Sequence, residues 1–189
     1  VAARLVPFAI GEDTGGSIRN PADWCGITGL KVTYGRVSRY GCISYASSFD
    51  SMGPMAKTAE DCAVVLEWIA GKDSLDATSS NIPVPKYSEE IKKDIKKTKI
   101  GVPKELFGNG LDREIKSAIE IAKKDFEKLG IEIVEISMPT FHYGIMAYYI
   151  MAPSETSSNL ARYDGIRFGQ SRENFTDETK RRIMIGIYT

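Results

Sequence analysis

The sequence is poor in the residues that most often carry metal sites and proton-transfer catalysis. It has a single histidine, His142, and three cysteines, Cys25, Cys42 and Cys62. The cysteines are widely spaced without a Cys-x-x-Cys pair, which argues against a zinc site or a disulfide framework and indicates small buried side chains. A Ser-His-Asp triad would have to use His142, which begins an apolar helical run where a structural role is more common. We therefore expect neither a metal site nor a histidine base.

Net charge and long apolar runs are also absent. Lysines and arginines number 25, as do aspartates and glutamates, so the chain has no basic field of its own to hold nucleic acid. No apolar run is long enough to span a bilayer, and the start does not resemble a signal peptide. We expect a cytoplasmic protein without a membrane partner, with an organellar location as the alternative. Its 189 residues suit one domain.

A glycine-rich stretch, residues 11–22, is what the sequence does have. It follows an apolar run, residues 5–10, that predicts a buried strand. Gly15 and Gly16 permit backbone conformations closed to other residues, so several N–H groups from Thr14 to Ser17 could point into one concavity. Acyl transfer needs a nucleophile beside such donors. The same spacing would also suit a simple turn or an anion-binding loop, and alone it does not choose between them.

The longer pattern is more specific. Asp13-Thr14-Gly15-Gly16-Ser17 is followed by Ile-Arg-Asn-Pro-Ala and then by Trp-Cys-Gly-Ile-Thr-Gly-Leu-Lys over residues 24–31. This string closely resembles the signature of the amidase signature family, and residues 33–41, 46–55, 147–155 and 180–183 extend the resemblance over nearly the whole chain. It implies an α/β protein, the C-terminal part of an α/β/α sandwich with a mixed sheet covered by helices. Residues 1–189 would be one domain truncated at both ends.

The resemblance implies a catalytic role for the glycine-rich loop. Ser17 would be the nucleophile that forms an acyl ester. The backbone N–H groups of Thr14, Gly15, Gly16 and Ser17 would form the oxyanion hole. In this family a catalytic lysine, and a serine on a cis peptide that relays the proton, precede the loop. Neither occurs in these residues, so the chain alone is expected to be inactive.

Two further residues gain roles from the same resemblance. Tyr148 would contact a glutamine substrate, and Arg182 would bind its carboxylate, a task that suits the planar guanidinium fork. Lys31 is the nearest lysine downstream of Ser17 and could be considered as a base. The corresponding lysine in the family is not catalytic, so we expect a structural or backbone-bonding role for Lys31.

The resemblance is strongest to the branch of the family that works in tRNA-dependent amidotransferases. It implies a glutaminase subunit that supplies ammonia for the amidation of Glu-tRNA(Gln) or Asp-tRNA(Asn). Other subunits, of the B and C type, would use ATP and magnesium and hold the tRNA, and this subunit would need no cofactor. The alternatives are a stand-alone amidase acting on another amide and a non-catalytic assembly module.

Patterns elsewhere predict the surrounding elements. Thr58 and Gly71 bound one helix, with Thr58 as its N-cap. Residues 99–102 and 131–136 predict two strands joined by a helix that Asp112 caps and Gly130 ends. Such a unit favours parallel pairing with a right-handed crossover. Residues 141–161 predict one more helix.

Overall fold

The computed structural model describes residues 1–95, 98–108 and 110–189. The chain divides into two compact units, Val1–Lys92 with Tyr148–Thr189, and Lys93–Ala147. Within the described residues no helix combines the length and the apolar character needed to cross a membrane. The first unit contains β1 (Phe8–Asp13), α1 (Arg19–Trp24), β2 (Thr28–Gly29), β3 (Ser51–Ala56), α2 (Ala59–Ile69), α3 (Tyr87–Glu90), most of α5 (Gly144–Leu160), the 3-10 turn η3 (Arg172–Asn174) and α6 (Asp177–Ile187).

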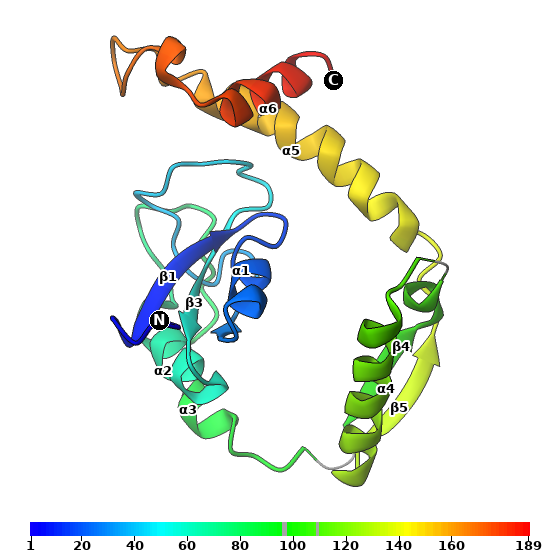
Figure 1. Cartoon of the computed structure of the whole chain (residues 1–189). Coiled ribbons are helices and arrows are strands. Elements are labelled where there is room, and N and C mark those ends of the chain that lie inside the picture. The colour runs from blue at the N-terminus through cyan, green and yellow to red at the C-terminus, as the bar shows by residue number, and fades with distance from the viewer. Residues whose placement is uncertain (96–97, 109) are drawn as a thin grey trace. The chain divides into compact units, whose positions relative to one another are not determined.

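An antiparallel sheet in the order β1-β3-β2 forms the centre of the first unit (Figure 1). β1 runs alongside β3, with Phe8 opposite Ala56 and Asp13 opposite Ser51. The strand predicted over residues 5–10 therefore starts and ends three residues later. It is also not buried, because Phe8 and Ile10 are 45% and 43% exposed. In the described part of the chain β1 pairs on one side only, so it is an edge strand of this sheet.

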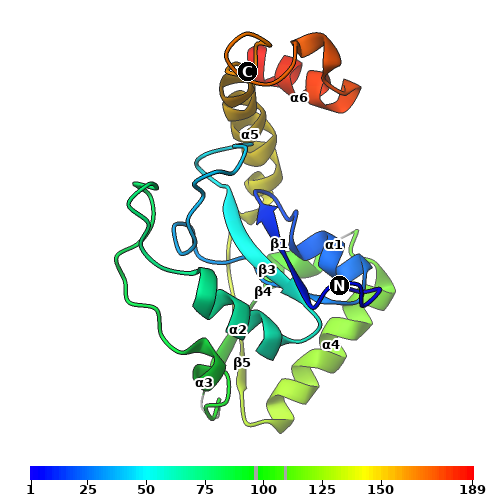
Figure 2. The same cartoon turned by 90° about the vertical axis from the view of Figure 1, so that its left-hand side faces the viewer.

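Helix α2 packs against β3, as both views show (Figures 1 and 2). The Thr58 hydroxyl accepts a hydrogen bond from the N–H of Asp61 at 3.1 Å, which confirms the predicted N-cap. The helix ends at Ile69, and Gly71 follows with a φ of 132° that favours glycine. Its buried side chains include Cys62 and Leu66, which contribute to a small core.

The second unit holds the predicted strand–helix–strand arrangement. Its elements are β4 (Lys99–Pro103), the 3-10 turn η1 (Lys104–Phe107), α4 (Arg113–Lys128), β5 (Glu132–Ile136) and the 3-10 turn η2 (Phe141–Tyr143). β4 and β5 pair in parallel, and α4 packs against β5. Asp112 caps α4 by accepting from the N–H of Glu114 at 2.7 Å, and Gly130 follows the helix with a positive φ. The parallel pairing and the α/β class are confirmed.

The polar side of α5 fixes a loop of the first unit. The predicted helix over residues 141–161 forms from Gly144 to Leu160, after the turn η2. Asn159 Nδ2 and Thr156 Oγ1 each donate to the carbonyl oxygen of Tyr45 at 3.2 Å. The carboxylate of Glu155 accepts from the N–H of Ser48 at 2.9 Å. These bonds hold the loop that presents the side chain of Tyr45.

Helix α6 approaches α5 closely where Gly186 meets Pro153. A Cβ on Gly186 would overlap the carbonyl oxygen of Pro153, so only glycine allows this backbone contact. Thr176 caps the helix by accepting from the N–H of Thr179. The close approach anchors α6, and with it Arg182, against α5.

The cysteines differ from the expectation that all three are buried. Cys62 is buried and Cys42 is partly buried, but Cys25 is exposed. Cys25 directly follows α1 and precedes Gly26, whose positive φ turns the chain at the surface. All three are free thiols, as expected. His142 is exposed in η2, in the second unit.

Candidate active site

The carboxylate of Asp13 organises the glycine-rich loop. Asp13 is the last residue of β1, fully buried, and its oxygens accept from the N–H of Gly16 at 2.7 Å and of Ile18 at 3.2 Å. The guanidinium of Arg19 adds two more bonds, from Nε at 3.0 Å and Nη2 at 3.1 Å. Burial alone would raise the pKa of Asp13, but the bonds from Arg19, Gly16 and Ile18 lower it below its usual value. The loop is thus wrapped around an ionised carboxylate.

Ser17 stands at the outer side of this loop. Its side chain is exposed, and within the described residues its hydroxyl makes no hydrogen bond. Gly16 has a φ of 125°, which favours glycine and turns the chain ahead of α1. The N–H of Gly16 already donates to Asp13, which is at variance with its expected place in the oxyanion hole. The N–H groups of Thr14, Gly15 and Ser17 remain the predicted donors of the oxyanion hole.

Tyr148 lies directly on this loop. A Cβ placed on Gly15 would come within 2.6 Å of Cε2 of the Tyr148 ring and 3.2 Å of its hydroxyl oxygen. The tyrosine comes from α5, in the part of that helix that belongs to the first unit. The structure therefore brings together two residues, Gly15 and Tyr148, that the sequence analysis placed in one site.

Arg182, from α6, reaches the same place. Its Nη1 donates to the Tyr45 hydroxyl at 2.6 Å, and its guanidinium lies 5.3 Å from the centre of the Tyr45 ring. Its Nε donates to Glu178 at 2.6 Å, and Tyr148 interacts with both Tyr45 and Arg182. The side chain of Arg182 is 37% exposed. The charge is thus oriented by two tyrosines and a carboxylate without being sealed from solvent.

The protonation of this cluster follows from its contacts. Burial raises the pKa of Tyr148, as does its interaction with Tyr45, so the phenol stays neutral and can donate. Burial would lower the pKa of Arg182, but its bonds with Glu178 and Tyr45 raise it above the usual value. The cluster therefore presents the positive charge of Arg182, paired with the Glu178 carboxylate, beside the neutral hydroxyl group of Tyr148.

Neither a base for Ser17 nor a metal site occurs in the described residues. Lys31 Nζ donates to the carbonyl oxygen of Val32 at 3.0 Å, which confirms its expected backbone-bonding role. The same residues contain no group of three or more histidine, cysteine or acidic side chains that could hold a metal ion.

Sequence reasoning missed Tyr45 and Asp50. The Tyr45 hydroxyl accepts from Arg182, and Asp50 accepts from the Thr14 hydroxyl at 2.5 Å. Both lie in a loop without helical or strand periodicity, so no spacing pattern points to them. Asp50 lies in the stretch 46–55 that carried the family resemblance, which was the only available signal, and Tyr45 lies just before that stretch.

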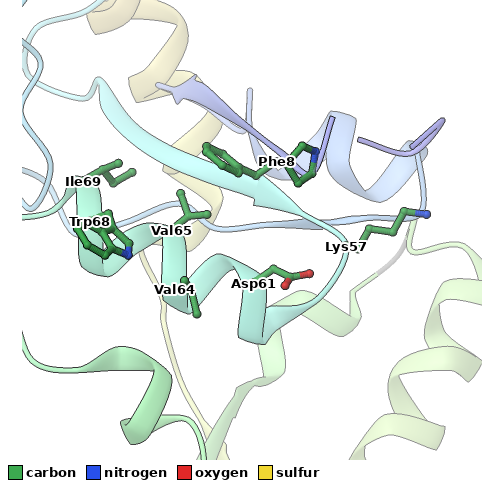
Figure 3. A pocket seen from close by; sticks show the side chains of 8 residues that line it. Phe8, Lys57, Asp61, Val64, Val65, Trp68 and Ile69 are labelled. Carbon is green, nitrogen blue, oxygen red and sulfur yellow. The ribbon is translucent and has the colours of Figure 1, made fainter. Parts of the chain in front are cut away.

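A hollow on the first unit lies apart from these residues. An open pocket of about 670 Å³ is lined mainly by apolar side chains of β1 and α2, among them Phe8, Val65 and Trp68 (Figure 3). Asp61 and Lys57 supply its charged groups. None of the predicted site residues lines it. Its composition suits packing rather than the recognition of a charged amino acid.

Known proteins resemble this chain over its whole length. The Amidase family matches residues 1–189. The A-type subunit of the glutamyl-tRNA(Gln) amidotransferase of Chromohalobacter salexigens is 55% identical over 204 aligned residues, which cover all of this chain and 42% of that protein. The crystal structure of the corresponding subunit of Thermotoga maritima is 38% identical, with a TM-score of 0.79 over 99% of this chain and 39% of that one. A native peptide amidase of Stenotrophomonas maltophilia is 29% identical, with a TM-score of 0.79 over 100% of this chain and 42% of that one.

These matches settle the fold and the family. The chain spans about 42% of the length of the curated relatives that it matches. The solved structures share its arrangement over nearly all of its length, at identities well above chance resemblance. The chain belongs to the amidase family and has the amidase signature fold.

Proposed function

We propose that this chain is part of a glutaminase subunit of a tRNA-dependent amidotransferase. The observation that carries the proposal is the convergence of Tyr148 and Arg182 on the loop of Gly15 and Ser17. A glutamine substrate offers an amide for the serine and a carboxylate for the arginine. The matched relatives are named as A-type subunits of glutamyl-tRNA(Gln) amidotransferases, and these names support the same assignment.

In this proposal Ser17 attacks the side-chain amide carbon of glutamine. The carbonyl π electrons move onto oxygen, where the N–H groups of Thr14, Gly15 and Ser17 stabilise the negative charge. We leave Gly16 out of this hole because its N–H donates to Asp13. Ammonia leaves as the intermediate collapses to an acyl ester, and water then attacks that ester to release glutamate.

Ser17 needs a proton acceptor that the described residues do not supply. A serine hydroxyl is a weak nucleophile until a base takes its proton. Within the described residues no lysine or histidine hydrogen-bonds to Ser17, and Lys31 bonds to backbone. We therefore propose that the lysine and the relaying serine of the family lie outside the matched segment, and that residues 1–189 alone hydrolyse little or no glutamine.

Arg182 and Tyr148 recognise the substrate in this proposal. The guanidinium is oriented by Glu178 and Tyr45 and still 37% exposed, so it can pair with the α-carboxylate of glutamine. The Tyr148 ring covers Gly15 and closes one side of the position that the amide would take. A neutral amide without a carboxylate would leave Arg182 unpaired, which favours glutamine over apolar amides.

We further propose that the ammonia passes to partner subunits of the B and C type. These would activate Glu-tRNA(Gln) or Asp-tRNA(Asn) with ATP and magnesium, in the cytoplasm. The balanced charge of this chain, 25 basic against 25 acidic residues, supports an indirect contact with tRNA through a partner.

The test is glutamine hydrolysis in the context of a whole subunit. The matched segment of the Chromohalobacter salexigens protein is replaced by residues 1–189, and ammonia release is measured with the partner subunits present. We expect activity in this chimaera and a loss of at least about a thousandfold on Ser17→Ala. Ser74→Ala, an exposed serine away from the site, is the matched control and should keep full activity.

Two outcomes would redirect the assignment. A chimaera that hydrolyses apolar amides faster than glutamine would favour a stand-alone amidase, the activity named in the Stenotrophomonas maltophilia relative. A chimaera that assembles with its partners but never releases ammonia would favour a non-catalytic module. Undiminished hydrolysis by Ser17→Ala would remove Ser17 as the nucleophile.

A further inference from the structure

Three polar side chains gather where β1 ends at the glycine-rich loop and β3 begins beside it. The antiparallel register places Glu12 opposite Met52 and Asp13 opposite Ser51. Side chains alternate along a strand, so Glu12 and Thr14 lie on one face and Asp13 lies on the other. Asp50, two residues before Met52, faces Thr14, and their side-chain oxygens are 2.5 Å apart. Glu12, Thr14 and Asp50 therefore share one face.

Asp50 acts as a hydrogen-bond acceptor at this place. It is only 2% exposed. Besides the Thr14 hydroxyl it accepts from the N–H of Tyr45 and of Ala46, each at 3.0 Å. Three donors that converge on one carboxyl group suit its acceptor-only, ionised form. Asp50 thus ties the start of the nucleophile loop to the loop that carries Tyr45.

Glu12 lies beside Asp50 on this face. Its Oε1 atom is buried and makes no hydrogen bond within the described residues. Burial raises the pKa of Glu12 to about 7, and the charge and hydrogen bond of Asp50 act in the same direction. Two carboxylates in contact repel each other, so one of them holds a proton. Asp50 has the donors, which leaves the proton to Glu12.

Other ionisable groups lie near Glu12, but they do not cancel the rise in its pKa. Arg39 lowers the pKa of Glu12, but its Nε lies 4.0 Å from Asp76, which takes up part of its charge. The thiol of Cys42 has a raised pKa, through burial and through the charges of Glu12 and Asp50. Cys42 is therefore neutral at neutral pH and adds no charge to the cluster.

We propose that Glu12 is a positioning residue for the nucleophile loop, through a single proton that it shares with Asp50. The Glu12 O–H donates to Asp50, and Asp50 in turn fixes the Thr14 hydroxyl and the backbone that continues into Gly15. When this proton is lost, the two carboxylates repel each other, and the hydrogen bond between Asp50 and the Thr14 hydroxyl is weakened. The relevance to catalysis rests on the proposed function, but the shared proton itself does not.

The sign of the pH effect follows from where the proton is held more tightly. Glu12 binds its proton in the folded state up to about pH 7, and in the unfolded chain only up to about its ordinary value of 4.5. Stability therefore falls as the pH rises from about 4.5 to about 7 and levels off above that. Ionisation of Glu12 should also open the glycine-rich loop locally, because repulsion between the two carboxylates weakens the hydrogen bond from Thr14 to Asp50.

The test is hydrogen exchange of the Gly16 amide, which is bonded to Asp13 and reports on the loop. Its protection is measured in the full chain by NMR at pH 5.5 and pH 8, corrected for the intrinsic rate. In the wild type we expect the protection of the Gly16 amide to fall by at least about tenfold from pH 5.5 to pH 8. A shift of one pKa unit corresponds to a factor of about ten. In Glu12→Gln, which cannot ionise, the change should stay below about twofold.

Two further measurements keep the proposal falsifiable. Glu127→Gln, an exposed glutamate of α4, should leave the wild-type fall in protection intact. If Glu12→Gln does not fold, carboxyl carbon NMR of the wild type labelled at glutamate should still show one carboxyl that titrates near pH 7. Equal pH dependence in wild type and Glu12→Gln, or glutamate carboxyls that all titrate near pH 4 to 5, would overturn the proposal. None of these readouts needs glutamine hydrolysis, so failure of the proposed function would not affect them.

Discussion

The ring of Tyr148 lies against the backbone of Gly15 so closely that no side chain fits between them. A Cβ on Gly15 would be 2.6 Å from Cε2 and 2.9 Å from Cζ of the ring. This contact joins α5 to the glycine-rich loop, although the two residues are more than a hundred positions apart in the sequence. It is also the contact by which the loop meets the cluster of Tyr45 and Arg182.

Gly15→Ala should displace Tyr148 and lower activity in the chimaeric subunit. The added methyl group overlaps the ring, and a shift of the ring moves a wall of the proposed substrate position. We expect a loss of at least about tenfold in kcat/KM for glutamine, because small misplacements at a reacting centre are costly. Gly144→Ala, where a Cβ would meet nothing within 4 Å, is the control and should be neutral or slightly stabilising. Equal activity of both variants would contradict the assigned contact.

Asp13→Asn should destabilise the folded chain. The substitution removes the charge that accepts bonds from Gly16, Ile18 and Arg19 in a fully buried position. We expect the free energy of unfolding to fall by about 1.5–3 kcal/mol, the usual contribution of hydrogen bonds to a charged group. Denaturant titration followed by circular dichroism measures it.

The control for Asp13 is Asp164→Asn. Asp164 has a comparable set of donors, the N–H of Ile166 and Arg167 and the Arg167 guanidinium, but at the protein surface. Exposed ion pairs contribute little, so the loss of unfolding free energy should be clearly smaller than that of Asp13→Asn. Similar losses in the two variants would mean that burial of Asp13 does not strengthen its bonds.

Acid should weaken the contribution of Asp13. Burial opposes its charged form, but the bonds from Arg19, Gly16 and Ile18 lower its pKa below the unfolded value. The stabilisation is therefore complete above about pH 4, the pKa of aspartate in an unfolded chain, and is lost as the pH falls below that value. The difference in unfolding free energy between wild type and Asp13→Asn should narrow between pH 5 and pH 2.5. A constant difference over this range would show that the carboxylate is not the group responsible.

Arg182→Lys should impair glutamine binding more than turnover. Lysine keeps the charge but cannot bond to Tyr45, Glu178 and a substrate carboxylate with one planar group. We expect KM for glutamine to rise by about tenfold or more, with a smaller change in kcat. Arg181→Lys, the neighbour that also pairs with Glu178, should leave both constants near the wild-type values. A larger effect at residue 181 would place the wrong arginine in the site.

The local elements were predictable because their signals are local. Thr58 and Asp112 accept from N–H groups two or three residues ahead, and Gly71 and Gly130 adopt the positive φ that follows a helix. Alternation of strand, helix and strand likewise required parallel pairing of β4 with β5. The predictions were wrong where a feature depends on contacts with residues far away in the sequence. These features are the bounds of strand β1 and the exposure of Cys25.

The sequence by itself determined the glycine-rich loop and the family, because the string of residues 11–22 carries that information. Tertiary structure alone decided what surrounds the loop. The buried carboxylate of Asp13 occupies the Gly16 N–H, and Tyr148 covers Gly15. Arg182 is oriented by Tyr45, a residue 137 positions away. Such contacts depend on how residues 148–189 pack against residues 1–92 within the first unit, and no local pattern specifies the approach of side chains so distant in sequence.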